Sequence, residues 1–312
     1  MTVTYSAPAK IILTGEHSVV YGKPALISAL DIRLTVTVRD TKQTKENHDI
    51  DIIAGHAKEY LKKSGISYED KPYSTYIQSD IPSRKNLGSS AALSVAASAA
   101  FLHFFAGHEL SKDAINQVAY QSEKHFHGNP SGGDNSASCF GGFIYYRKEF
   151  EFLKNVSALS AKLPKNIMER LFIVDSGKSV EKTSEMVAKV GAFYNEDPKH
   201  AEQIMNEIEK VSKRMVIAIV KEDKTMFADA VSKNESCLEE LGVVSPETIK
   251  LIQSLSAFGV AKVTGGGGFK SGSGNLLFFA QEPERAISIF KERAISFMKF
   301  HQDFEGVRRE QV

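Results

Sequence analysis

The sequence predicts an α+β protein built from two domains, and three observations support this fold class. The chain has 312 residues, which is enough for about two domains of roughly 100–200 residues each. Segments with strand character dominate the first half, whereas helical patterns dominate the second half. The composition also shifts near residues 159–170. We therefore expect one domain over residues 1–165 and another over residues 166–312.

The first half of the sequence is expected to contain several strands. Apolar and β-branched residues alternate or run together over residues 3–13 and 32–38, which predicts two strands. Residues 50–53 and 73–77 are weaker strand candidates. Residues 136–146 are expected to form a further strand with small side chains on one side.

Two helices are expected between these strands. Residues 91–105 are apolar nearly all round, which predicts a central buried helix. Residues 111–126 begin with a serine that can cap a helix. The apolar face of this second helix would consist of Ile115, Val118, Ala119 and Phe126.

The order of patterns in the second half predicts a second α+β domain. Residues 171–175 are expected to form a strand, and residues 275–280 another, with a strand and a glycine loop just before the latter. A short strand should end the chain. Helical patterns cover residues 180–193, 201–221, 224–241, 246–258 and 282–294.

Composition and charge narrow the class of protein. The formal net charge is +1, so composition gives no argument for a nucleic-acid or membrane-surface partner. Two cysteines, Cys139 and Cys237, without the spacing of a zinc site, indicate free thiols in a reducing compartment. No signal-peptide pattern opens the sequence, and the apolar stretch 91–106 is too short to span a bilayer and contains serines and a histidine. We expect a cytoplasmic protein.

Residues 86–92 read Asn-Leu-Gly-Ser-Ser-Ala-Ala. Small residues let a backbone approach a ligand, and a helix starting at Ser89 or Ser90 would direct free N–H groups at an anion. The serine hydroxyls could cap the helix, contact phosphate or bind Mg²⁺. An ordinary serine-capped helix would show the same pattern. Residues 175–179 are not a P-loop, because Phe172 stands where that motif requires glycine.

Three ionisable residues stand in unusual positions. Glu123 lies on or beside the apolar face of the helix expected over residues 111–126, and needs a bound cation or a nearby lysine as its partner. Asp134 follows turn formers at residues 127–133, which suits an exposed catalytic base or plain turn chemistry. Lys10 lies in an apolar strand and needs an anionic partner, which Asp134 or a phosphate would supply.

Two further segments suggest ligand contact. Gly-Glu-His-Ser at residues 15–18 follows the first strand, where a binding loop could lie, although a lone histidine such as His17 is more often structural. Four consecutive glycines at residues 265–268 are entropically costly. We therefore expect them to lie close to a ligand or to another backbone.

Taken together, residues 8–22, 86–92 and 262–274 resemble the three motifs of the GHMP small-molecule kinases, and residues 127–135 also match that family. The resemblance implies an N-terminal ribosomal-protein-S5-like domain, a C-terminal ferredoxin-like domain and an active site in the cleft between them. It implies phosphorylation of a small alcohol, with ATP and Mg²⁺ as cofactors. A homodimer is also considered, although nothing in the residue spacing demonstrates one.

The resemblance assigns roles to individual residues. Asp134 matches the catalytic base, and Lys10 matches the lysine that stabilises the alkoxide and the transferring phosphate. Ser90 and Glu123 match the magnesium ligands. The ATP-binding loop would consist of Asn86, Leu87, Gly88, Ser89, Ser90 and Ala91. The substrate pocket would include Glu16, His17, Asp134, Thr183, Gly265 and Gly266.

Three departures from the family pattern carry expectations of their own. Ala9 and Asn86 stand where the family has glycine, and both should be tolerated if their backbones keep negative φ. Phe269 and Lys270 follow the glycine run where relatives continue with glycine or a small residue. A difference in loop geometry is therefore expected there, and Lys270 would be either a phosphate contact or a solvent-exposed lysine.

Three alternative functions remain open. They are a sister kinase with another substrate, a decarboxylase of the same superfamily and a non-catalytic binding protein. The segment at residues 15–17 argues against the decarboxylase, which would be expected to lack it. The non-catalytic alternative is opposed by the presence of Lys10, Ser90, Glu123 and Asp134.

Overall fold

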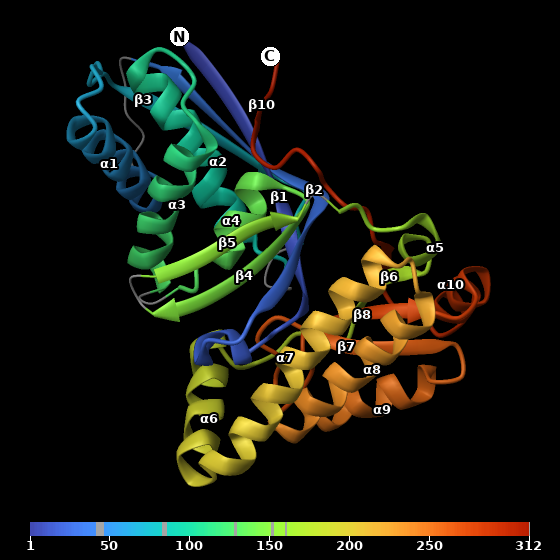
Figure 1. Ribbon diagram of the computed structural model, residues 1–312. Coiled ribbons are helices and arrows are strands. Elements are labelled where there is room, and N and C mark those ends of the chain that lie inside the picture. Colours follow the sequence, from blue (N-terminus) through green and yellow to red (C-terminus); the bar gives the residue numbers. More distant parts are fainter. Residues whose placement is uncertain (42–46, 83–85, 128–129, 151–152, 160, 312) are drawn as a thin grey trace.

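A computed structural model describes residues 1–41, 47–82, 86–127, 130–150, 153–159 and 161–311. It contains two β-sheets, each covered by helices (Figure 1). The six-stranded sheet has the order β10-β1-β2-β4-β5, with β3 also paired to β2. The four-stranded sheet has the order β7-β8-β6-β9. The α+β class predicted from the sequence is confirmed.

The first sheet is built on two long antiparallel strands. Strands β1 and β2 pair from Thr2↔Arg39 to Thr14↔Leu26, with register shifts near Pro8 and Ile12. Both faces of β1 are buried almost throughout, which explains its nearly continuous apolar sequence. The strands of this sheet are β1 (Thr2–Thr14), β2 (Ala25–Asp40), β3 (Tyr73–Ser79), β4 (Phe143–Phe150), β5 (Leu153–Leu159) and β10 (Arg308–Arg309).

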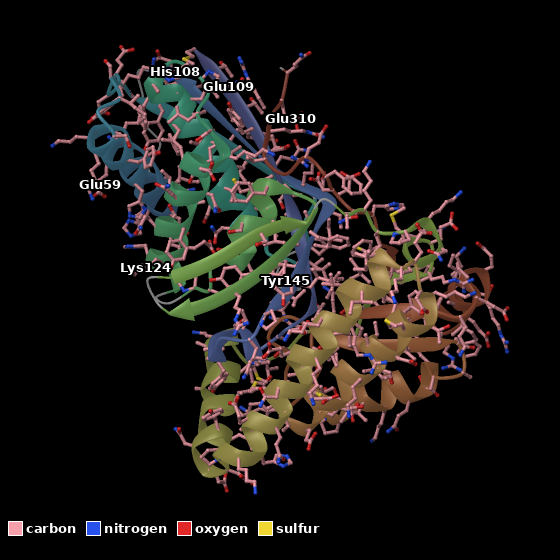
Figure 2. The ribbon with its side chains drawn as sticks, in the orientation of Figure 1. Glu59, His108, Glu109, Lys124, Tyr145 and Glu310 are labelled. Atoms are coloured by element: carbon pink, nitrogen blue, oxygen red, sulfur yellow. The ribbon has the colours of Figure 1, made fainter. Side chains whose placement is uncertain are left out.

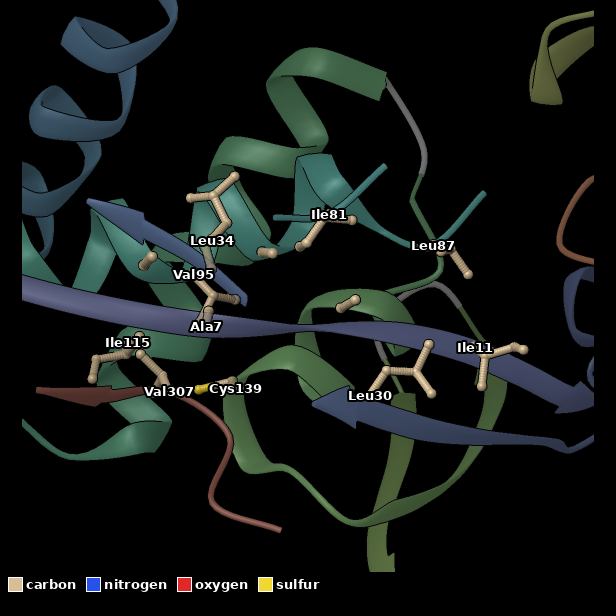
Figure 3. Packing of buried hydrophobic residues seen from close by; sticks show 14 of the residues in the cluster. Ala7, Ile11, Leu30, Leu34, Ile81, Leu87, Val95, Ile115, Cys139 and Val307 are labelled. Carbon is tan, nitrogen blue, oxygen red and sulfur yellow. The ribbon is translucent and has the colours of Figure 1, made fainter. Parts of the chain in front are cut away.

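Helix α2 (Ser89–Ala106) is the centre of the first core, as predicted. It packs on β1 and β2 and is surrounded by α1 (His48–Lys63), α3 (Lys112–His127) and α4 (Gly133–Phe140). Its 18 residues have the length and the mean hydropathy, 1.5, of a membrane span, so the expectation that the stretch is too short was wrong. However, 78% of it is buried inside the protein, as in a core helix. Figure 3 shows this core, in which α2 side chains meet those of β1 and β2.

The helices around α2 present polar residues to solvent. Glu59 of α1 and Lys124 of α3 are exposed on the outer faces of their helices (Figure 2). Ser111 caps α3, since its Oγ accepts a hydrogen bond from the Ala114 N–H at 3.3 Å. These positions agree with the amphipathic pattern expected of a helix that covers a sheet.

Two strand predictions in the first half are wrong. Residues 50–53 belong to α1, whose buried residues recur every three to four positions at Ile50, Ile53, Ala54, Ala57 and Leu61. The predicted strand over residues 136–146 is instead the end of α4, a turn at Gly141 and Gly142 with φ of 76° and 66°, and the start of β4. Short runs of small or apolar residues fit both the helical and the strand period, so the sequence pattern alone could not distinguish the two structures.

The second half follows the prediction more closely. Its strands are β6 (Leu171–Asp175), β7 (Gly259–Thr264), β8 (Asn275–Ala280) and β9 (Phe297–Lys299). Its helices are α5 (Lys165–Met168), α6 (Thr183–Glu196), α7 (Pro198–Val220), α8 (Lys224–Glu240), α9 (Pro246–Leu255) and α10 (Pro283–Glu292). Side chains of Asp197, Asp223 and Ser245 cap α7, α8 and α9, so local signals fix where these helices begin.

After β9 the chain returns to the first sheet. Residues 300–310, which we call the C-terminal strap, run from β9 to β10, and β10 pairs with β1 at Tyr5↔Arg309 and Ser6↔Arg308. Figure 1 shows the two ends of the chain at the same end of the molecule. The first sheet therefore combines residues from the beginning and the end of the sequence.

Candidate active site

Lys10 and Asp134 form an ion pair, with 3.0 Å between Lys10 Nζ and Asp134 Oδ2. Lys10 lies on β1 with its side chain only 5% exposed, whereas the Asp134 side chain is 41% exposed. Asp134 stands in the first turn of α4 rather than in the predicted loop, so the positive end of the helix dipole favours its negative charge. The anionic partner expected for Lys10 is thus Asp134, and the carboxylate remains accessible to a ligand.

The segment 86–91 lies beside this pair. The Lys10 N–H donates to the Leu87 carbonyl at 2.9 Å, and a Cβ on Gly88 would be 2.6 Å from Cγ of Lys10. Gly88, with φ of 75°, immediately precedes α2, which begins at Ser89 as expected. The first turn of α2, whose N–H groups have no intrahelical partners, therefore begins next to Lys10.

Asn86 overturns one expectation, because its φ is +61° rather than negative. Asparagine adopts this left-handed conformation more readily than other residues with a Cβ, which explains the substitution for glycine. The Asn86 side chain occupies space left free by two glycines of the third motif, Gly265 and Gly274. A Cβ on Gly265 would be 2.8 Å from Asn86 Cβ, and one on Gly274 would be 2.8 Å from Asn86 Nδ2. Ala9, in contrast, lies in β1 and has no positive φ.

Glu123 is buried, with 5% of the residue exposed, and faces α2. Its Oε1 accepts hydrogen bonds from Ser90 Oγ and Ser94 Oγ, both at 2.7 Å. The spacing argument thus placed Glu123 correctly on the apolar face of α3. The structure adds the serine hydroxyls of α2, which bring Glu123 to the first turn of that helix.

His17 lies at the third motif. Its Nε2 is 3.2 Å from the Gly266 carbonyl, and because a carbonyl can only accept, Nε2 carries the proton. Burial lowers the pKa of His17 to about 4, although the bond to Gly266 opposes the shift. The imidazole is therefore neutral near pH 7, with Nδ1 as a hydrogen-bond acceptor. A Cβ on Gly266 would be 3.3 Å from Thr183 Oγ1, so Thr183 lies against this loop.

The Glu16 side chain lies in a buried cluster with residues of β7 and α8. It is 1% exposed and forms an ion pair with Lys262 of β7, which is fully buried. Glu235 of α8 accepts a hydrogen bond from the Val263 N–H at 2.7 Å, and burial raises the pKa of this carboxyl to about 8. The cluster therefore holds one lysine between one paired carboxylate and one carboxyl that is mostly protonated at neutral pH.

Sequence reasoning missed Lys262 and Glu235. The signal for Lys262 is the same as for Lys10, a lysine inside an apolar strand. Thr264, two residues further, joins β7 to β1, because its Oγ1 accepts from the Ile12 N–H at 3.2 Å and donates to the Ile12 carbonyl at 3.0 Å. These contacts bring the first and third motifs together although they are far apart in sequence.

The remaining predictions concern residues 128–129, Phe269 and Lys270. Gly128 and Asn129 of the segment at residues 127–135 lie outside the described residues. Phe269 packs beneath two ammonium groups, with Lys189 Nζ at 4.7 Å and Lys270 Nζ at 5.4 Å from its ring centroid. Lys270 is exposed, which agrees with the solvent-lysine alternative.

Comparison with known proteins identifies the family. Residues 51–142 match the domain described as GHMP kinases N terminal domain. A protein of Archaeoglobus fulgidus named mevalonate kinase is 31% identical over 98% of this chain and 99% of its own length. This chain belongs to the GHMP kinase family.

Two further comparisons agree. A mevalonate kinase of Pyrococcus furiosus is 34% identical to this GHMP kinase, over 86% of this chain and 87% of its own. The crystal structure of Methanococcus jannaschii mevalonate kinase superposes with a TM-score of 0.76 at 22% identity, covering 97% of this chain and 98% of that one. The two-sheet GHMP kinase fold expected from the resemblance is confirmed.

As a GHMP kinase the protein uses ATP. Ser90 in the first turn of α2 and the neighbouring Glu123 of α3 fit a Mg²⁺ ion carried by the nucleotide, because hydroxyl and carboxylate oxygens are ligands that Mg²⁺ prefers. Among the described residues, no group of three or more His, Cys, Asp or Glu side chains is placed to hold a metal. Ser90 and Glu123 as Mg²⁺ ligands stay a prediction.

Proposed function

We propose that this GHMP kinase transfers the γ-phosphate of ATP to the primary hydroxyl of mevalonate, giving 5-phosphomevalonate and ADP. The observation that carries the proposal is the ion pair of Lys10 and Asp134, 3.0 Å apart, next to the glycine–serine segment at the start of α2. It supplies a base and a cation beside a phosphate-binding helix end. The relatives named mevalonate kinase, similar over most of this chain, support the choice of alcohol.

In the proposed mechanism, Asp134 accepts the proton of the substrate hydroxyl as its oxygen attacks the γ-phosphorus. Lys10 stabilises the alkoxide character of that oxygen and the charge on the transferring group. Residues 86–91 bind the nucleotide, and the N–H groups at the start of α2 hold its phosphates. Mg²⁺, bound by Ser90, Glu123 and the nucleotide, would neutralise phosphate charge. Because phosphoryl transfer depends mainly on position and charge, these few groups suffice.

The mevalonate pocket is proposed on the side of His17, Thr183, Gly265 and Gly266. The neutral His17 offers Nδ1 as an acceptor for a hydroxyl group of the substrate, since Nε2 is engaged by Gly266. Glu16 belongs to the same segment, but its carboxylate is engaged by Lys262. We therefore assign Glu16 the task of holding the His17 loop in place.

Replacing Glu123 with glutamine is expected to raise the Mg²⁺ concentration for half-maximal rate by roughly 10–100-fold. Glutamine keeps an oxygen for the Ser90 and Ser94 hydroxyls but loses the charge that attracts the cation. The KM for the alcohol should stay within twofold. The measurement is a Mg²⁺ titration at saturating ATP, with the exposed Glu59→Gln of α1 as the matched control. An unchanged Mg²⁺ requirement would remove Glu123 from the proposed ligands.

The function itself is tested by coupled ADP release with ATP and Mg²⁺. Mevalonate, phosphomevalonate, galactose and homoserine are compared at equal concentrations. Turnover with mevalonate alone would support the proposal. Turnover with another alcohol, but not with mevalonate, would assign the chain to a sister GHMP kinase and place the error in the pocket around His17 and Thr183.

A further inference from the structure

The C-terminal strap contacts the helix that carries Asp134. The Val307 N–H donates to the Cys139 carbonyl at 3.0 Å, and the Gly142 N–H donates to the Asp303 carbonyl at 2.7 Å. Val307 and Cys139 also lie side by side in the core (Figure 3). The strap therefore holds the C-terminal end of α4 by main-chain bonds and by packing.

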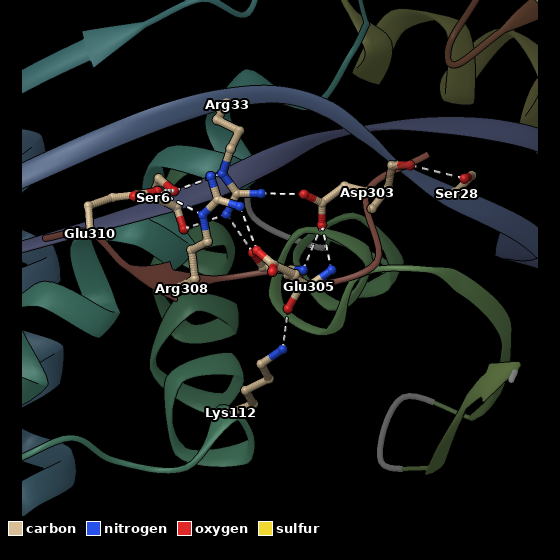
Figure 4. A network of polar contacts seen from close by, with 10 residues as sticks. Ser6, Ser28, Arg33, Lys112, Asp303, Glu305, Arg308 and Glu310 are labelled. Atoms are coloured by element: carbon tan, nitrogen blue, oxygen red, sulfur yellow. Dashed lines mark hydrogen bonds and ion pairs between the residues drawn. The ribbon is translucent and has the colours of Figure 1, made fainter. Parts of the chain in front are cut away.

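A buried ion pair anchors the strap to the first sheet. Arg33 of β2 pairs with Asp303, and their side chains are only 11% and 4% exposed. Arg33 also donates to the Gly306 carbonyl at 2.6 Å and to Ser6 of β1, with 2.7 Å between Arg33 Nε and Ser6 Oγ (Figure 4). One guanidinium thus ties together β1, β2 and the strap.

The strap and α4 approach so closely that neither can carry a side chain at the contact. A Cβ on Gly306 would be 2.3 Å from the Cys139 carbonyl oxygen, and one on Gly141 would be 2.4 Å from the Gly306 nitrogen. Both glycines have positive φ, 67° and 76°. Asp303 Oδ1 fixes the turn that presents Gly306, accepting from its N–H at 2.6 Å.

We propose that the C-terminal strap positions α4, with Arg33, Asp303 and Gly306 as positioning residues that keep Asp134 beside Lys10. Lys10 is part of β1, to which the strap is fastened by β10 and Arg33. Asp134 is part of α4, whose far end the strap holds. At about 1.5 Å per helical residue, Cys139 lies only about 7.5 Å along α4 from Asp134, so displacement of that end moves the base. The inference rests on the proposed role of Asp134.

Gly306→Ala is expected to lower kcat by about 10–100-fold, because misplacement by about 1 Å can cost 10²-fold in rate. The KM for ATP should stay within twofold, since the strap does not touch residues 86–91 in the contacts described. Deuterium exchange should rise in residues 133–142 and remain unchanged in α2. Asp303→Asn, which keeps an acceptor for Gly306 but removes the charge facing Arg33, should change the same quantities in the same direction.

The matched control is Glu305→Gln in the same strap. Glu305 is 63% exposed and pairs with Arg308, and it touches Lys112 only through its main-chain oxygen. This variant should keep the wild-type kcat. If Gly306→Ala and Asp303→Asn also keep the wild-type kcat, the strap does not position Asp134 and the proposal is wrong. If KM for ATP and exchange in α2 change along with kcat, the strap stabilises the fold generally and the proposal is also wrong.

The proposed function and the proposed role of the strap are tested by different measurements, so one can be wrong while the other holds. Wild-type turnover with mevalonate tests the function, and the ratio of variant to wild-type rates tests the strap with whichever alcohol turns over. Deuterium exchange in residues 133–142 needs no substrate, so it tests the link between the strap and α4 even for an enzyme whose alcohol is unknown.

Discussion

Asp134→Asn is expected to lower kcat by about 10²–10⁴-fold while leaving nucleotide binding intact. Asparagine has the shape of aspartate but cannot accept the hydroxyl proton at neutral pH. The side chain is 41% exposed, so the change creates no cavity in the core, and Lys10 keeps a polar neighbour. Steady-state rates and ATP affinity, measured on the same preparation, separate loss of chemistry from loss of binding.

The control for this experiment is Asp113→Asn. Asp113 also stands in the first turn of a helix, α3, and is exposed, so its replacement has the same electrostatic effect on a helix end without touching Lys10. It should leave kcat unchanged. A near-normal rate in Asp134→Asn would assign the base to another residue.

Lys262→Met is expected to lower the free energy of unfolding by about 3–5 kcal/mol, the usual cost of removing one partner from a buried ion pair. Methionine fills much of the same volume, but the Glu16 carboxylate, 1% exposed, loses its cation. Glu235 cannot replace the cation, because a carboxyl group carries no positive charge in either protonation state. Urea unfolding at pH 7 measures the loss.

Two further variants test why Lys262→Met is expected to be less stable. Glu16→Gln combined with Lys262→Met should recover much of the stability, because no unpaired charge remains in the cluster. Lys165→Met, which breaks the exposed pair with Glu169, should have little effect. If the double variant were as unstable as Lys262→Met alone, lost packing rather than lost charge would explain the result.

Long periodic segments were predictable from the sequence because their pattern admits one period only. The helices of the second half and the buried α2 are of this kind. Residues 50–53 and 136–146 were assigned wrongly because a few small or apolar residues satisfy both the helical and the strand period. The division into domains at residues 165 and 166 stays a prediction.

In the candidate site, the sequence showed which residues need partners but not always which partners they have. Glu123 was placed on an apolar face by spacing alone, yet its bonds to Ser90 and Ser94 depend on how α3 packs on α2. Lys262 pairs with Glu16 because β7 lies against β1, a long-range register that no local pattern encodes. The left-handed Asn86 was missed for the same reason, since the space for it is made by Gly265 and Gly274.

The strap also imposes an order on folding during translation. β1, β2 and α4 are all synthesised before residues 300–310, yet the last turn of α4 and one edge of β1 are completed only by those residues. Domains fold as the ribosome delivers them, N-terminal parts first. Lys10 in the first sheet and Asp134 in α4 can therefore emerge from the ribosome in folded elements and reach their final alignment only when residues 300–310 follow. The N-terminal half of the chain therefore reaches its final packing only after the C-terminal half has been synthesised.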